Sequence, residues 1–136
     1  MGGAVKEITR TGPNHEGVDE FNAVLASSQY TIAYFTATWC GPCRQISPVY
    51  QKFAEQFSIP GYLSFTKIDV DLQPELAQMY DIRAMPSFIF FKDGKRVKVN
   101  GIYKLEGGNP PVLGAAVGKL GKLAKEKAMA AAEGGK

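Results

Sequence analysis

Residues 30–43 read YTIAYFTATWCGPC, and the rest of the chain is best interpreted outward from this stretch. Its first seven residues are β-branched, aromatic or small and carry no charge, which is typical of a central strand buried on both faces. Its last four residues contain both cysteines of the chain, Cys40 and Cys43. A Cys-x-x-Cys pair that follows a buried strand and opens a helix indicates a reversible dithiol/disulfide centre.

The composition indicates a single globular domain. A chain of 136 residues with 45% hydrophobic residues buries enough apolar surface to fold without a disulfide. The net charge is +3. Much of this excess lies from Lys119 onward, where the chain has five lysines and only two glutamates. Because the remainder is close to neutral, we expect no nucleic-acid partner.

The sequence contains no apolar stretch of the roughly 20 residues that a membrane span needs. Residues 1–10 lack the apolar core of a signal peptide. We therefore expect a cytoplasmic protein without membrane contact, in a reducing compartment where paired cysteines are more often catalytic than structural. A metal site is not predicted, because two thiolates do not complete a tetrahedral zinc site.

Hydrophobic periodicity predicts alternating strands and helices. The expected strands are residues 5–8, 30–36, 62–70, 87–92 and 95–99, and the expected helices are residues 17–27, 40–57, 73–80 and a last one that begins at Asn109 and Pro110. This order predicts an α/β fold with a mixed central β-sheet flanked by helices on both faces. We expect one domain over residues 1–122, followed by an Ala/Lys-rich extension over residues 123–136 that continues the last helix or is disordered.

With these elements and motifs, residues 5–122 resemble the thioredoxin family and its fold. The matching features, in chain order, are Trp39-Cys40-Gly41-Pro42-Cys43 between strand and helix, Pro48 within that helix, the segment 82–88 with Pro86 at the family's cis-proline, the hairpin at 91–95, and Gly101 as the family's late glycine. Because five features occur in the right order, the resemblance is far more specific than a bare Cys-x-x-Cys motif.

The resemblance implies protein-disulfide reduction by thiol–disulfide exchange, with Cys40 as nucleophile and Cys43 as resolving cysteine. Unpaired N–H groups at the helix start favour the Cys40 thiolate, so its pKa is expected below the free value of about 8.5. The Gly41-Pro42 pair is associated in the family with a reducing potential. The implied partners are disulfide-containing substrate proteins and a flavoprotein thioredoxin reductase that uses NADPH; the chain is expected to be a monomer and to bind no cofactor itself.

The resemblance also implies a flat apolar surface on which an extended substrate docks beside the disulfide. Its expected members are Trp39, Pro42, Met85, Pro86 in the cis form, Gly101 and Ile102. The main chain of Met85 would pair with the substrate in the manner of an added β-strand.

One position departs from the family: Tyr34 stands where thioredoxins usually have a buried aspartate, whose lysine partner corresponds to Lys67. The aspartate is thought to accept the proton of the resolving cysteine. A phenolic hydroxyl, with a typical pKa of about 10, is a poor base at neutral pH. Two interpretations follow. Either Tyr34 is a core aromatic and Cys43 resolves the mixed disulfide more slowly, with proton transfer through water, or the tyrosine indicates a specialised protein.

Three alternatives to a reductase stay open at this point. The first is a redox-gated protein-binding module whose turnover is attenuated because Tyr34 replaces the aspartate. The second is an oxidase or isomerase of the same fold, which the Gly41-Pro42 pair disfavours. The third is a glutathione-dependent glutaredoxin, a family that usually has Pro-Tyr or a similar pair between its cysteines.

Overall fold

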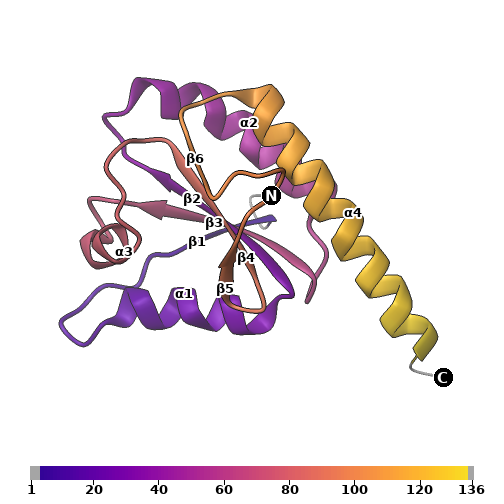
Figure 1. Cartoon of the computed structure of the whole chain (residues 1–136). Coiled ribbons are helices and arrows are strands. Elements are labelled where there is room, and N and C mark those ends of the chain that lie inside the picture. Colours follow the sequence, from indigo (N-terminus) through magenta and orange to yellow (C-terminus); the bar gives the residue numbers. More distant parts are fainter. Residues whose placement is uncertain (1–3, 135–136) are drawn as a thin grey trace.

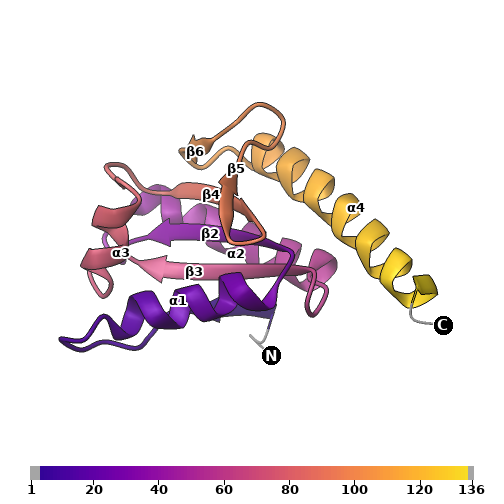
Figure 2. The same cartoon turned by 60° about the horizontal axis from the view of Figure 1, so that its bottom comes forward.

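The computed structural model describes residues 4–134. In this part, a β-sheet lies between two layers of helices, with α2 and α4 on one face and α1 and α3 on the other (Figures 1 and 2). The strands are β1 (Val5–Glu7), β2 (Tyr30–Thr36), β3 (Leu63–Asp69), β4 (Ser87–Lys92), β5 (Lys95–Val97) and β6 (Lys104–Glu106). The helices are α1 (Glu16–Ser27), α2 (Gly41–Phe57), α3 (Pro74–Met79) and α4 (Pro110–Gly134).

The sheet is mixed, as predicted. Its order is β1-β3-β2-β4-β5, and β6 pairs with β4 as well. Strand β2 runs parallel to β3 and antiparallel to β4, so it has a hydrogen-bonded neighbour on each side. Strands β5 and β6 pair with successive parts of β4. The strand that leads into the cysteine pair therefore lies at the centre of the sheet.

All seven residues of β2 are buried, and their side chains alternate between two cores. Tyr30, Ile32 and Tyr34 belong to the cluster that α2 and α4 cover. Ala33 and Phe35 belong to the cluster beneath α1 and α3. This double burial explains why the strand contains no charged residue, as the sequence indicated.

The main difference from the sequence prediction lies between β4 and α4. The strand expected over residues 95–99 ends at Val97, and an isolated bridge joins Val99 to Ile102 around a tight turn. Strand β6 was not predicted. It has three residues, of which only Leu105 is buried, so it is too short to show an alternating pattern.

Two helix starts agree with their sequence signals. Helix α2 begins after Cys40 and has Pro42 in its first turn and Pro48 in its interior. Helix α4 begins at Pro110, and the Asn109 side chain caps it by accepting the Val112 N–H at 3.1 Å. The last buried residue of α4 is Ala124; beyond it the helix extends away from the sheet (Figures 1 and 2).

Tyr50 provides a test of this core at alkaline pH. Its hydroxyl donates to the Thr66 carbonyl at 2.8 Å, and burial raises the pKa of Tyr50 well above its ordinary value. Above about pH 10 the unfolded chain loses this proton while the folded chain keeps it, so the free energy of unfolding falls by up to about 1.4 kcal/mol per pH unit. We expect Tyr50→Phe to show a shallower alkaline decline in urea melts; parallel declines would contradict the assignment.

Candidate functional site

The cysteine pair lies at the start of α2, shortly after the end of β2. Cys40 is the N-cap of α2, Cys43 lies in its first turn, and the two form a disulfide with a Cα–Cα distance of 5.3 Å. The Cys43 N–H donates to Cys40 Sγ at 3.2 Å. After reduction, the same N–H and the positive end of α2 would stabilise a thiolate on Cys40. This geometry suits Cys40 to the attacking role and Cys43 to the resolving role.

Apolar groups surround the disulfide, and one aromatic side chain beside it is exposed. Ala37, Val70 and Met85 pack around the two cysteines, and the Met85–Pro86 peptide bond is cis, as predicted. The Trp39 side chain is 65% exposed, although its Nε1–H donates to Asp71 Oδ2 at 2.8 Å. The indole ring is thus held in place and remains open to a partner molecule.

The structure corrects the predicted placement of Gly101 and Ile102. Gly101 lies with Tyr30 and Lys119 around a pocket of about 510 Å³, at the end of β2 opposite Cys40. Ile102 forms the bridge to Val99. The prediction failed because β6 was not foreseen: the chain makes one more turn and one more strand before it reaches the disulfide.

Gly107 and Gly108 occupy the place that the sequence analysis gave to Gly101. The Gly107 N–H donates to the Pro86 carbonyl at 2.9 Å. A Cβ atom on Gly108 would lie 3.6 Å from the Pro42 carbonyl oxygen and 3.8 Å from Pro86 Cγ. The signal in the sequence was a pair of glycines directly before the helix-capping Asn109.

Tyr34 is fully buried directly beneath the first turns of α2. Its ring stacks on Phe88 of β4 at a centroid distance of 4.9 Å and contacts Tyr50 of α2 at the same distance. Its hydroxyl donates to the Cys43 carbonyl at 3.1 Å and lies 2.6 Å from Ser47 Oγ. The tyrosine therefore fills the core and also touches the backbone of the resolving cysteine. Sequence reasoning did not identify Ser47.

A pocket of about 220 Å³ adjoins Cys43, and Ser47, Lys67 and Asp69 are among the residues that line it. Lys67 lies opposite Tyr34 in the β2–β3 register. Among the ion pairs of the described residues none involves Lys67, and Asp69 Oδ1 instead accepts the Asp71 N–H at 2.9 Å. Asp69 therefore does not replace the missing aspartate as an ion-pair partner of Lys67.

The family model named Thioredoxin matches residues 14–109, which is more than half of the chain. The chain belongs to the thioredoxin family. It is 52% identical to a thioredoxin of Neurospora crassa over 112 residues, which cover 82% of this chain and 88% of that protein. It is 38% identical to thioredoxin-1 of Saccharomyces cerevisiae over 98 residues, covering 72% of this chain and 87% of that one.

Solved structures agree with the thioredoxin assignment. The crystal structure of Malassezia sympodialis thioredoxin superposes with a TM-score of 0.67 at 33% identity and covers 86% of this chain and 93% of its own. The solution structure of oxidised Plasmodium falciparum thioredoxin gives a TM-score of 0.68 at 30% identity, covering 85% and 96%. Thioredoxins are thiol–disulfide oxidoreductases, so membership and the Cys40–Cys43 pair together support protein-disulfide reduction.

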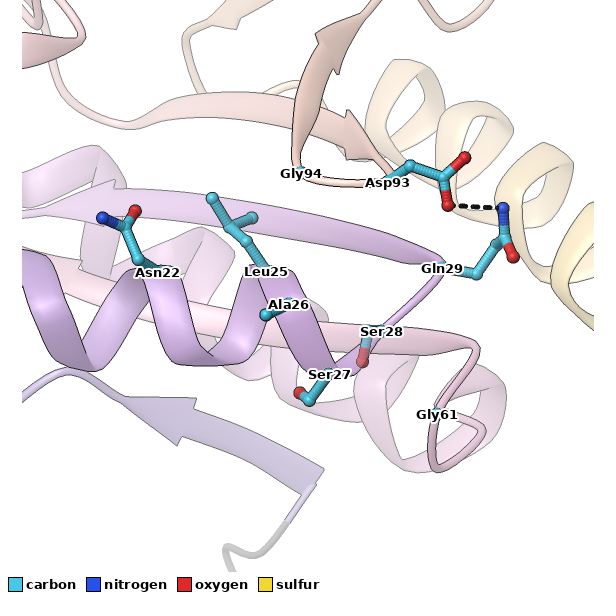
Figure 3. Close-up of a pocket in the computed structure, with 9 residues that line it drawn as sticks. All are labelled: Asn22, Leu25, Ala26, Ser27, Ser28, Gln29, Gly61, Asp93 and Gly94. Atoms are coloured by element: carbon cyan, nitrogen blue, oxygen red, sulfur yellow. Dashed lines mark hydrogen bonds between the residues drawn. The ribbon is translucent and has the colours of Figure 1, made fainter.

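A second pocket lies away from the disulfide. An open pocket of about 600 Å³ lies beside the end of α1, where Gln29 donates to Asp93 Oδ1 at 2.8 Å (Figure 3). Its lining is mostly small or uncharged polar, and it lies at the end of β2 away from Cys40. Within residues 4–134, no three metal-binding side chains cluster, and no helix is both long and apolar enough to span a bilayer.

A matched pair of glycine variants tests the corrected placement. Gly101 and Gly107 both have positive φ, 80° and 101°, so an alanine is strained at either position and costs on the order of 1–2 kcal/mol. Only Gly107 bonds to Pro86 beside the disulfide. We expect Gly107→Ala to lower kcat/KM for insulin reduction several-fold, while Gly101→Ala stays near the parent. Equal activities in the two variants, with stability checked by urea melts, would contradict this placement.

Proposed function

We propose that this chain reduces disulfide bonds of other proteins in the cytoplasm and is itself reduced by a flavoprotein thioredoxin reductase that draws on NADPH. The observation that carries the proposal is the Cys40–Cys43 disulfide at the start of α2, with the Cys43 N–H directed at Cys40 Sγ. The proposal includes a monomeric chain. It also includes no bound cofactor, because the reduced cysteine pair itself carries the two electrons.

The proposed reaction has two exchange steps. The Cys40 thiolate attacks one sulfur of the substrate disulfide, forms a mixed disulfide with it and releases the other substrate sulfur as a thiolate. Cys43 then gives its proton, through water, to the released substrate thiolate and attacks Cys40 Sγ, which forms the Cys40–Cys43 disulfide and releases the second substrate sulfur as a thiolate. The substrate gains two electrons, and the reductase returns two electrons to the cysteine pair.

We further propose that the substrate docks beside the disulfide, on a surface where Trp39 and Pro42 are exposed and Met85 is partly exposed. The corrected members of this surface are Trp39, Pro42, Met85, Pro86, Gly107 and Gly108. An extended segment of the substrate would lie along Met85 and Pro86, with its disulfide over Cys40. Gly41, Pro42 and Lys67 are proposed to tune the potential, since the first two lie between the cysteines and Lys67 lines the pocket beside Cys43.

Cysteine variants test the proposed roles in insulin reduction with dithiothreitol. We expect the parent chain to accelerate the reaction and Cys40→Ser to abolish the acceleration, because no attacking thiolate remains. Without dithiothreitol, reduced Cys43→Ser should form a mixed disulfide with insulin at Cys40 and retain it, which mass spectrometry detects. If the parent does not accelerate insulin reduction, or if Cys40→Ser accelerates it as much as the parent, the result would favour a binding module over a reductase.

A further inference from the structure

The backbone of Cys43 is held on both sides, and only one of the two contacts comes from the cysteine motif itself. Its N–H donates to Cys40 Sγ at 3.2 Å, and its carbonyl accepts the Tyr34 hydroxyl at 3.1 Å. The second contact joins the central strand β2 to the first turn of α2. It exists in this chain because a tyrosine stands at position 34.

The donor and acceptor roles in this small network follow from proton counting. The Tyr34 hydroxyl has one proton, which it donates to the Cys43 carbonyl. The contact of 2.6 Å with Ser47 must then run the other way, so Ser47 Oγ–H donates to Tyr34 Oη. Ser47 therefore supports the tyrosine, while the tyrosine alone contacts the Cys43 carbonyl.

The helical hydrogen bonding of α2 is interrupted next to this contact. Pro48 lies inside α2 and has no N–H, so the carbonyl four residues earlier, at Arg44, loses its helical donor. The first turn, which contains Cys43, is therefore joined less firmly to the rest of α2. The Tyr34 hydroxyl bonds to the carbonyl next to this interruption. Its ring is held between Phe88 and Tyr50, so the hydroxyl is a fixed anchor.

We propose that Tyr34 is a positioning residue for the resolving cysteine: its hydroxyl holds the Cys43 peptide so that the Cys43 sulfur stays within reach of Cys40. This inference deepens the proposed reductase function and rests on it. In the resolving step, the Cys43 sulfur must approach Cys40 Sγ along the disulfide axis, and orientation of this kind contributes strongly to intramolecular rates. The same contact keeps the Cys43 N–H directed at Cys40 Sγ.

Tyr34→Phe removes the hydroxyl and keeps the ring that packs on Phe88. We expect the rate at which Cys43 resolves a mixed disulfide between Cys40 and a small aromatic thiol to fall about fivefold, which corresponds to the loss of one hydrogen bond of about 1 kcal/mol. We also expect the pKa of reduced Cys40, followed by thiolate absorbance, to rise, because its N–H donor is less firmly held. Stopped-flow measurements from pH 6 to about pH 9 separate the two effects.

Tyr50→Phe is the matched control for a general loss of core stability. It also removes a fully buried hydroxyl that donates to a backbone carbonyl, that of Thr66, and lies 3.2 Å from the Ile32 carbonyl oxygen, but it has no bond to Cys43. We expect comparable stability losses in the two variants and an unchanged resolution rate and Cys40 pKa in Tyr50→Phe. Equal rates of mixed-disulfide resolution in Tyr34→Phe and Tyr50→Phe would overturn the proposal.

Ser47→Ala provides the second comparison. This variant leaves the Tyr34–Cys43 bond in place and removes only its support, so we expect its resolution rate to stay within about twofold of the parent. Losses as large as those of Tyr34→Phe would overturn the specific role of the Cys43 carbonyl. Failure of the parent in insulin reduction would instead contradict the proposed function, while the Cys40 pKa would still report the Tyr34 contact.

Discussion

The double burial of strand β2 is the constraint on which the site depends. Strand β2 pairs with β3 on one side and β4 on the other, and helices cover both of its faces. The carboxyl end of β2 is therefore held in one position. Cys40 follows that end after three residues and caps α2, whose side chains pack on the same sheet. The position of Cys40 is therefore set by the core of the domain and not by a flexible loop.

The same burial gives Tyr34 its importance. A charged aspartate at this position would need a partner in the core, whereas a tyrosine contributes an aromatic ring to a cluster that already contains Phe88 and Tyr50. The hydroxyl then reaches the Cys43 carbonyl and Ser47. From the sequence, core filling and altered chemistry were alternatives for Tyr34; the structure gives it the first role, and the proposed positioning of Cys43 would add the second.

Much of the fold could be predicted because its signals are local. The uncharged run of β2, the cap and proline at the start of α4, and the Asp93-Gly94 hairpin each occupy a few consecutive residues. Strand β6 has no such signal, since one buried side chain in three residues shows no period, and the docking glycine was misplaced as a result. The Tyr34–Cys43 contact joins two elements across the core, so no spacing along the chain reveals it.

The reduction potential of the Cys40–Cys43 pair, measured by equilibration with glutathione, is the most direct test of a protein-disulfide reductase. The Gly41-Pro42 pair, which the family associates with a reducing potential, is expected to give a potential close to that of thioredoxin, about −270 mV. A value between about −180 and −120 mV, the range of disulfide isomerases and strong oxidants, would contradict the reductase assignment.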